Sequence, residues 1–414
     1  MMKVRLFSLQ IILLSVLPLP ALNAQQPLLQ FEDDFYLKSA WQEYMPEAYA
    51  INDSIIVTAG LNTNVNTLSM NLFVRWMHVD GTIQRETEIL NIENPDAGSY
   101  YLPSYRIKSA IDDNFIYLIS VAESAGCESI GEMYRTYHFS KVSLSNGMVE
   151  KDTFICFDDI RVYQDLSTFP GNDTLYLYGS KGYLNQNPLI ILTTLSKDFT
   201  EIESHEIQTE DTHLLPLGDQ NDPRAVAGSH HPYDDDYENQ DVWFGKIEGD
   251  SIRQDFSMKY FDRDYLRKSV KLDDRETAFV SYDILFAVSE SSIYLFRDDT
   301  LRWNFYDASF IELEDIQKIG DHYCILESSF RHDDDRQDKI ILHFIDEKGF
   351  PYASKEFVTP WIAFAMTGLL IDDYYFAFVY INNYDVFQQV SDGEILIEDA
   401  HFEYTHVFKL RINE

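Results

Sequence analysis

A short acidic turn that recurs seven times is the feature of this sequence that most limits how the chain can fold. At each repeat an aspartate precedes a run of apolar and aromatic residues: Asp53 leads into SIIVTAG, Asp113 into NFIYLIS and Asp373 into YYFAFVY. The seven turns are at Asp53, Asp113, Asp173, Asp222, Asp274, Asp321 and Asp373, with spacings of 60, 60, 49, 52, 47 and 52 residues. The chain therefore consists of seven repeats of similar length.

A second set of turns divides each repeat further. These turns are Asp80-Gly81, Asn146-Gly147, Lys197-Asp198, Gly249-Asp250, Asp298-Asp299 and Lys348-Gly349. Asn-Gly and Asp-Gly pairs between apolar runs are strong hairpin signals, because both residues tolerate the positive φ of a type I′ turn. The runs before these turns are more apolar than the runs after them. We therefore expect buried inner strands and a half-exposed outermost strand in each repeat.

A repeat of about 50 residues that contains only strand-like segments is typical of a β-propeller, with one blade per repeat. The last repeat supplies a second strand at Tyr374–Tyr380 and a third at Thr405–Ile412, after which the sequence stops. The segment Leu28–Leu37 can provide the missing outer strand and so remove the exposed edges. We predict an all-β, seven-bladed propeller of four-stranded blades, closed by the N-terminal strand, in a single domain over residues 25–414. Six or eight blades would follow if one repeat were split or merged.

In this architecture the chain resembles secreted bacterial β-propellers of the seven-bladed, WD40/YVTN-like type over about residues 28–414. The resemblance is architectural, because no Trp-Asp pair ends a strand and neither kelch Gly-Gly pairs nor a YWTD motif is present. The segment Ser196–Thr200 shares part of the sialidase box S-x-D-x-G-x-T-W but lacks its Gly and Trp, and is more simply a hairpin turn. The resemblance implies a rigid ring of loops and no specific activity.

The N-terminus has the layout of a signal peptide. Lys3 and Arg5 precede the apolar run Leu6–Leu19, and the small residues that follow predict cleavage after Ala24. We expect residues 1–24 to be removed and the mature protein to be exported to the periplasm, the cell surface or the medium. An N-terminal membrane anchor is the alternative, but the apolar run is short and broken by prolines. No later segment reaches the ~18 apolar residues of a membrane span.

Composition narrows the class of partner. The chain has 69 acidic and 32 basic residues, a net charge of −37. Such a surface repels nucleic acid and anionic lipid, since phosphate binding depends on Lys and Arg. The chain is also 45% hydrophobic and 14% aromatic, which is sufficient for a large core. These values favour a folded protein with a protein, peptide or glycan partner and no nucleic-acid partner.

Two loops between predicted second and third strands concentrate histidine and aspartate. The candidate ligand or metal residues are His230, His231, Asp234, Asp235 and Asp236 in the fourth repeat, and His332, Asp333 and Asp334 in the sixth. Clustered carboxylates suit Ca²⁺, and imidazole with carboxylate suits another divalent cation such as Zn²⁺ or Mn²⁺. Neither loop has a D-x-D-x-D-G or H-E-x-x-H spacing. The alternative is that both are solvated loops that simply carry charge.

The three cysteines fall into two groups. Cys127 and Cys156 lie in one repeat, near positions that meet on one face of a blade, and form a candidate disulfide closing a loop of about 30 residues. A free pair is the alternative. Cys324, inside the apolar run HYCIL, is expected to be a buried, unreactive thiol.

Two functions stay open at the level of the sequence. The first is a non-enzymatic binding propeller that presents its loops to a protein, peptide or glycan. The alternative is an exported, cation-assisted hydrolase or lyase that uses the His and Asp loops. First-strand residues that would line the central channel are another place for a ligand, and their cations would suit an anionic one: Arg106, Lys108, Arg161, Gln164, Lys268 and Lys271. Structural pairing with neighbouring Asp or Glu is the favoured explanation of these residues. No G-x-S-x-G elbow or Gly-rich phosphate loop is present, and the catalytic residues stay unknown.

Overall fold

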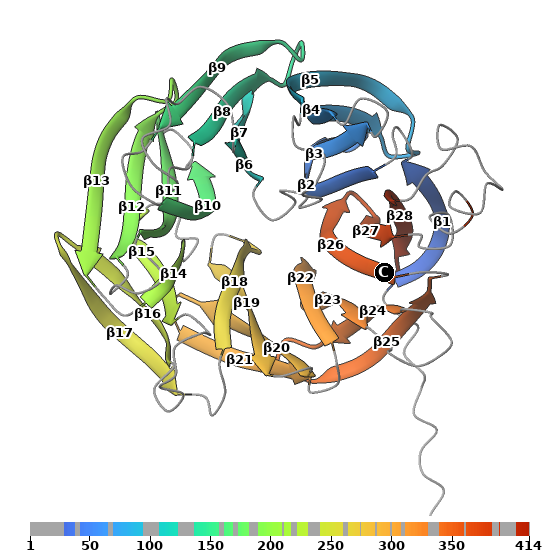
Figure 1. The fold of residues 1–414 in the computed structure, drawn as a ribbon. Helices are drawn as coiled ribbons and strands as arrows, with labels where there is room; N and C mark the ends of the chain where they lie inside the picture. Colours follow the sequence, from blue (N-terminus) through green and yellow to red (C-terminus); the bar gives the residue numbers. More distant parts are fainter. Residues whose placement is uncertain are drawn as a thin grey trace, which may run out of the picture.

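The computed structural model describes most of the chain. The described residues are 29–37, 42–64, 69–93, 107–122, 136–156, 161–168, 173–181, 189–208, 211–216, 222–230, 241–259, 264–273, 275–285, 288–298, 300–307, 311–329, 339–359, 362–382, 389 and 403–413. These residues form seven antiparallel sheets of four strands each, arranged as a ring (Figure 1). The predicted all-β, seven-bladed propeller is confirmed.

The first four blades follow one another along the chain. Blade 1 comprises β2 (Gln42–Asn52), β3 (Ile55–Asn64), β4 (Ser69–His78) and β5 (Ile83–Glu93). Blade 2 comprises β6 (Lys108–Ile111), β7 (Phe115–Ala122), β8 (Thr136–Ser143) and β9 (Val149–Cys156). Blade 3 comprises β10 (Arg161–Thr168), β11 (Thr174–Lys181), β12 (Leu189–Ser196) and β13 (Glu201–Gln208). Blade 4 comprises β14 (Asp211–Pro216), β15 (Ala225–His230), β16 (Asp241–Glu248) and β17 (Ser251–Lys259).

The remaining three blades include the one that joins the two ends of the propeller. Blade 5 comprises β18 (Asp264–Lys271), β19 (Glu276–Leu285), β20 (Val288–Arg297) and β21 (Thr300–Asp307). Blade 6 comprises β22 (Ile311–Ile319), β23 (His322–Ser329), β24 (Lys339–Ile345) and β25 (Pro351–Val358). Blade 7 comprises β26 (Ile362–Ile371), β27 (Tyr374–Asn382) and β28 (Glu403–Ile412), with β1 (Leu29–Leu37) as its outermost strand.

The acidic turns lie between the first and second strands, as predicted. In several of them a short side chain accepts hydrogen bonds from the backbone of the turn. The side-chain Oδ1 of Asp112 accepts hydrogen bonds from the backbone N–H of Asn114 and Phe115, each at 2.9 Å. Asp273 and Asp222 accept equivalent bonds in blades 5 and 4. Such Asx turns favour aspartate and asparagine because the short side chain replaces a backbone acceptor. Among these turns, only in blade 4 is the acceptor the predicted aspartate, Asp222; in blades 1, 2 and 5 it is the residue before it, Asn52, Asp112 and Asp273.

The hairpins between the third and fourth strands differ in detail from the predicted type I′ geometry. Each described turn has a single residue of positive φ, such as Gly81 at 83° and Gly349 at 89°. A Cβ on Gly81 would lie 2.5 Å from the Phe35 ring of the neighbouring blade, so the turn needs glycine for two reasons. In blade 3 the position is filled by Phe199, at φ 63°, whose buried ring packs on Phe139 of blade 2.

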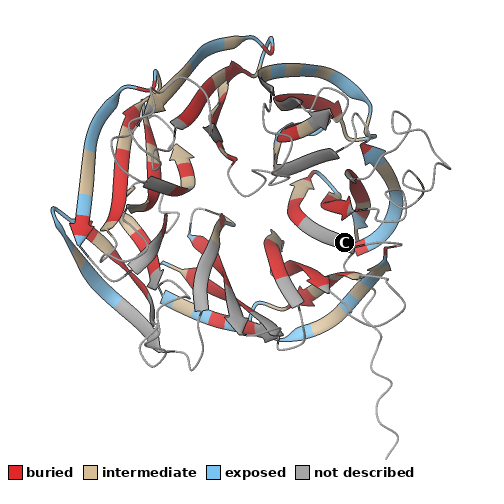
Figure 2. Ribbon diagram, in the orientation of Figure 1, coloured by how far each residue is buried: buried red, intermediate tan, exposed pale blue. Residues whose placement is uncertain are grey.

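Burial follows the predicted gradient from the centre of each blade to its outer edge. Third strands such as β12 are mostly buried, whereas the outermost strands β13 and β25 consist mainly of exposed and partly buried residues (Figure 2). The hydrophobic clusters join second and third strands of neighbouring blades, for example Tyr117 and Phe139 of blade 2 with Leu177 of blade 3. The core is therefore a set of interfaces between blades, and each blade depends on its neighbours to bury its apolar side chains.

The ring is closed by hydrogen bonding between β1 and β28. The two strands are antiparallel, with pairs that run from Leu29 with Ile412 to Leu37 with Thr405. Leu29 and Leu37 are buried at the two ends of β1, in the cores that join blade 7 to its two neighbours. The predicted closure by the N-terminal strand is thus confirmed, with β1 as the only edge partner of β28 in the described sheet.

Ion pairs add contacts between blades on the face that carries the tight turns. Lys197 of blade 3 donates to Asp112 of blade 2 at 2.6 Å. Lys318 of blade 6 lies 2.5 Å from Asp273 and 2.7 Å from Glu276 of blade 5. Because the Glu276 side chain is fully buried, this ion pair is held away from solvent and links the two blades.

Leu37→Ala tests the closure. Removing a buried leucine side chain costs about 2–5 kcal/mol of unfolding free energy, because transfer energy is lost and a cavity stays behind. We expect Leu37→Ala to lower the unfolding free energy by that amount in urea titrations. The control is Gln30→Ala on the exposed part of β1, with an expected change within about 0.5 kcal/mol. An equal loss of unfolding free energy in the two variants would contradict the role of β1 in closing the ring.

Candidate functional site

The sequence-predicted His and Asp loops emerge from the face opposite the tight turns. Both connect a second strand to a third strand, one between β15 and β16 in blade 4 and one between β23 and β24 in blade 6. His230 is the last residue of β15, and its side chain lies outside the described residues. The other candidates, His231, Asp234, Asp235, Asp236, His332, Asp333 and Asp334, also lie outside the described residues. Their role as ligands stays a prediction.

The cysteine predictions have different outcomes. Cys127 and the side chain of Cys156 lie outside the described residues, so their pairing stays a prediction. Cys324 is a free and fully buried thiol in β23. Burial raises the pKa of Cys324 well above its usual range, which keeps the sulfur protonated and unreactive. The expected inert thiol is confirmed.

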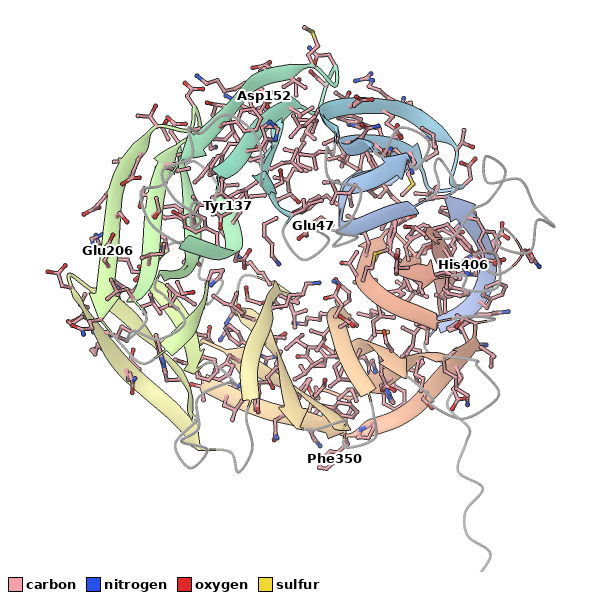
Figure 3. The ribbon with its side chains drawn as sticks, in the orientation of Figure 1. Glu47, Tyr137, Asp152, Glu206, Phe350 and His406 are labelled. Atoms are coloured by element: carbon pink, nitrogen blue, oxygen red, sulfur yellow. The ribbon has the colours of Figure 1, made fainter. Side chains whose placement is uncertain are left out.

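Several ionisable residues occupy equivalent positions on the first strands, at the centre of the ring. In every blade one residue of the first strand pairs with the fifth residue of the second strand, for example Glu47 with Ala59 and Asp315 with Leu326. The seven equivalent residues are Glu47, Lys108, Asp165, His213, Lys268, Asp315 and Thr367. We call this set the central ring. Figure 3 places Glu47 at the inner edge of blade 1.

A β-bulge precedes the central-ring position in six of the seven first strands. The bulges lie between Tyr44 and Glu47, Tyr163 and Asp165, Asp211 and His213, Leu266 and Lys268, Leu313 and Asp315, and Ala365 and Thr367. A bulge bends the strand and turns the next side chain in a new direction. Its repetition at one register explains why six strands present the same position toward the ring centre.

Asp315 is the most firmly held member of the central ring. Its side chain is 1% exposed and accepts hydrogen bonds from the Thr367 hydroxyl at 2.9 Å and the Gly368 backbone N–H at 2.7 Å, both in blade 7. The Ile316 backbone N–H donates to its other oxygen at 2.8 Å. Lys268 of blade 5 lies 3.3 Å away. Asp315 thus joins three blades.

Asp165 and Glu47 have fewer hydrogen bonds described than Asp315. Asp165 accepts from the backbone N–H of Leu166 at 2.8 Å and from the Ser269 hydroxyl at 3.4 Å, a contact from blade 3 to blade 5. Burial raises the pKa of Asp165, opposed by Lys108 and these hydrogen bonds. Burial likewise raises the pKa of Glu47, to about 7, against the opposing charges of Lys108 and Lys268. The centre of the ring therefore holds a carboxyl group that titrates near neutral pH.

The sequence identified part of the central ring but missed its acidic members. Lys108 and Lys268 were expected either to bind an anion or to pair with carboxylates, and Lys268 pairs with Asp315. A signal for the rest does exist in the sequence: Glu47, Lys268, Asp315 and Thr367 each lie six residues before the aspartate of the acidic turn. The spacing is 5, 8 and 9 residues for Lys108, Asp165 and His213, because blade 2 lacks the bulge and the turns that follow β10 and β14 are longer. Alternation alone therefore does not predict which positions face the centre.

Blade 2 contains a serine, a histidine and an aspartate in contact, an arrangement the sequence did not reveal. Asp152 is paired with His138 Nε2 and accepts from the Ser140 hydroxyl at 2.9 Å. In a catalytic triad the histidine uses one nitrogen for the serine and the other for the carboxylate. Here His138 Nε2 faces both partners, and its side chain and that of Ser140 are buried. The cluster ties β8 to β9 and has no exposed nucleophile.

Asp152→Asn tests this structural role. Burial raises the pKa of Asp152, but hydrogen bonds from His138 and Ser140 more than offset it and leave the pKa below the usual value. The stabilisation is present above the unfolded-state pKa and is lost as pH falls through the folded-state pKa. Since the carboxylate is 40% exposed, we expect Asp152→Asn to cost only about 1 kcal/mol in urea titrations at pH 7.

Two further results distinguish a structural cluster from a catalytic one. We expect Ser140 to resist labelling by a fluorophosphonate probe in the folded protein. Glu150→Gln, at an exposed position of β9, should leave stability unchanged. Stoichiometric labelling that Ser140→Ala abolishes would contradict the structural assignment.

Within the part of the chain that the structure describes, no three His, Cys, Asp or Glu side chains are grouped to hold a metal ion. Among the same residues, no helix is long and apolar enough to cross a membrane.

Comparison with known proteins agrees with the architecture. The β-propeller domain of the Trilobed protease from Pyrococcus furiosus, described as having an open velcro topology, is similar with a TM-score of 0.50 and 9% identity over 91% of this chain and 97% of that one. Acylaminoacyl peptidase from Pyrococcus horikoshii is similar with a TM-score of 0.45 and 10% identity, over 82% of this chain and 51% of that one. Prolyl oligopeptidase B from Galerina marginata is similar with a TM-score of 0.44 and 13% identity, over 83% of this chain and 45% of that one.

The likeness to the Trilobed protease propeller shows the fold alone. The chain spans about half the length of the two peptidases it resembles. No family model matches the sequence, and no curated protein matches it. The chain is a seven-bladed β-propeller whose outer strand in blade 7 comes from its N-terminal segment.

Proposed function

We propose that this protein is an exported binding propeller that presents the loops of one face to a protein, peptide or glycan. The observation that supports this proposal is the difference between the two faces. Most connections on the tight-turn face are short, such as residues 53–54, 320–321 and 372–373, and the longest between first and second strands is 217–224. Connections on the opposite face, which we call the loop face, include the longer segments 94–107, 123–135, 231–240 and 383–402.

The composition of the loop-face connections suits recognition. They carry Tyr100, Tyr101, Tyr105, Tyr134, Tyr233, Tyr237 and Tyr384. Tyrosine supplies a rigid apolar surface with a polar tip and loses little conformational entropy on binding. Long connections on a rigid scaffold are also where binding residues concentrate, because they vary without loss of the core. The net charge of −37 favours a neutral or basic partner.

Array binding tests this function. Peptide and glycan arrays would be probed with residues 25–414 and with a Tyr233→Ala/Tyr237→Ala variant. We expect a ligand whose affinity falls at least tenfold in the variant, about 1.4 kcal/mol. The control is Phe350→Ala, an aromatic side chain that is 65% exposed on the tight-turn face (Figure 3). Binding that is lost in Phe350→Ala and kept in the tyrosine variant would place the binding surface on the tight-turn face instead of the loop face.

A cation in the His and Asp loops is tested separately. Metal content and thermal melting would be measured with and without EDTA and added Ca²⁺ or Zn²⁺. A cation at ~100 Kd stabilises the folded state by about 2.7 kcal/mol, which is visible as a raised Tm. A stoichiometric metal that is lost in Asp234→Asn/Asp235→Asn/Asp236→Asn would favour the cation-assisted hydrolase or lyase over a simple binding role. No metal and no change in Tm would favour the binding role.

Export rests on the N-terminal segment and has its own test. We expect the protein expressed from its full sequence in a bacterial host to appear outside the cytoplasm, with Gln25 as its first residue by intact mass and N-terminal peptide analysis. Arg inserted into the apolar run Leu6–Leu19 should block processing, since that run is what the export machinery recognises. An unprocessed product in the cytoplasm would contradict export.

A further inference from the structure

The outer edge of blade 7 carries an exposed tyrosine on a rigid support. Tyr36 of β1 is 50% exposed, and one face of its ring is stacked on His406 of β28, with ring centroids 4.1 Å apart and planes 19° from parallel. Nε2 of His406, which Figure 3 labels in blade 7, lies 2.6 Å from Oδ2 of Asp34. Tyr404 packs edge-on against Tyr36, with centroids 5.6 Å apart. Since His406 covers one face of a ring that is half exposed, the other face is open to solvent.

Blade 2 contains an equivalent arrangement in a closed form. His138 lies opposite Phe154 in the register of β8 and β9, and Asp152 lies opposite Ser140. The carboxylate of Asp152 accepts a hydrogen bond from the Ser140 hydroxyl at 2.9 Å in addition to its contact with His138. The Phe154 ring is partly buried, with its centroid 4.8 Å from that of His138 and its plane tilted by 39°. Both the carboxylate and the aromatic ring are therefore engaged within blade 2.

Blade 7 keeps the register and changes two of the residues. Tyr36 lies opposite His406, and Asp34 lies opposite Phe408. Phe408 has no side-chain hydrogen to donate, so Asp34 lacks the second donor that a serine supplies in blade 2. Within the described residues the Asp34 side chain bonds to His406 through one oxygen, and it is 34% exposed. Asp34 thus keeps a charged oxygen for a further donor, on the same side of β1 as the open face of Tyr36.

An aromatic strip continues from this point across the boundary between blades 7 and 6. The His406 and Phe408 centroids are 4.0 Å apart, those of Phe408 and Phe357 of β25 are 4.8 Å apart, and those of Phe357 and Phe31 of β1 are 6.2 Å apart. Phe31 is 40% exposed, so the strip ends in a second accessible ring on β1. Lys355 Nζ lies 5.9 Å from the Phe357 centroid, which shows that this surface accommodates a cation over an aromatic ring.

We propose that Tyr36 and Asp34 form a docking site for an arginine side chain in an extended segment of a partner protein. A guanidinium group is planar, stacks on an aromatic face and donates hydrogen bonds to a carboxylate, and this site presents both groups. An aromatic ring alone would suit a glycan equally well, but the carboxylate beside it adds affinity for a cation. The net charge of −37 favours a basic partner and disfavours a second copy of this chain.

This site is separate from the function proposed above, because none of its residues belongs to the loop-face connections. Tyr36 and Asp34 lie on β1, and His406 and Phe408 lie on β28. The two proposals therefore stand or fall independently.

Arginine peptides test the site directly. Fluorescence anisotropy would measure binding of the protein to fluorescein-labelled Gly-Arg-Gly-Arg-Gly and to the same peptide with lysine or citrulline in place of arginine. We expect saturable binding of the arginine peptide, binding at least about threefold weaker with lysine, and none with citrulline, which keeps the shape of arginine without its charge. No saturable binding of the arginine peptide up to about 1 mM, or equal binding of the citrulline peptide, would overturn the proposal.

Variants locate the binding on β1. Asp34→Asn should weaken binding of the arginine peptide about tenfold, since the hydrogen bonds lose their charged acceptor. Asp152→Asn, the equivalent change in blade 2, should leave the affinity unchanged. Tyr36→Leu should weaken binding about fivefold through loss of the stacked ring, and Tyr36→Phe should retain it. Equal losses in Asp34→Asn and Asp152→Asn would show attraction to negative charge in general and would overturn the site.

Two controls complete the test. Thermal melting would be measured for each variant, because β1 closes the ring, and if Tyr36→Leu fails to fold, Asp34→Asn and its counterpart in blade 2 decide the question. The loop-face variant Tyr233→Ala/Tyr237→Ala should bind the arginine peptide with unchanged affinity. Loss of binding in that variant, with binding kept in Asp34→Asn, would assign the peptide to the loop face and overturn the site on β1.

Discussion

The pairing of β1 with β28 is the interaction on which the rest of this structure depends. Without β1, blade 7 would leave the backbone groups on the outer edge of β28 without a hydrogen-bond partner. Leu29 and Leu37 enter the cores on either side of blade 7, so one nine-residue strand completes two blade interfaces at once. The central ring exists only because this closure sets all seven first strands around one axis.

Charge is used in two different ways in this protein. Within the described scaffold, acidic side chains have defined partners: Asp112 caps a turn and binds Lys197, and buried Glu276 binds Lys318. These contacts hold neighbouring blades together where burial makes an unpaired charge costly. The loop-face segments carry acidic and tyrosine residues that the core does not need. A scaffold that satisfies its own charges leaves the loops free to adapt to a partner, which is why the proposed function belongs to the loops.

Particular residues show how far the sequence alone could go. The repeated Asp before each second strand predicted the turns, yet in blades 1, 2 and 5 the turn hydrogen bond is accepted by the residue before it, Asn52, Asp112 and Asp273, because either short side chain can accept it. The glycine turns predicted the hairpins, but Phe199 takes a positive φ in blade 3, since its buried ring offsets the backbone strain. Glu47 and Asp315 were not predicted as a set, because residues 268 apart in the sequence meet only when the ring closes.

The sequence by itself determined the number of blades, the four strands in each and the strand that closes the ring, because turn chemistry and alternating burial are local and repeat every 50 residues or so. Only the tertiary structure decided which polar side chains share the centre and which histidines and serines are structural. Those outcomes depend on the β-bulges and on contacts between blades, whose energies arise from distance and burial in three dimensions. The approach of Ser269 to Asp165 across the ring is one such contact, and no local pattern in either strand predicts it.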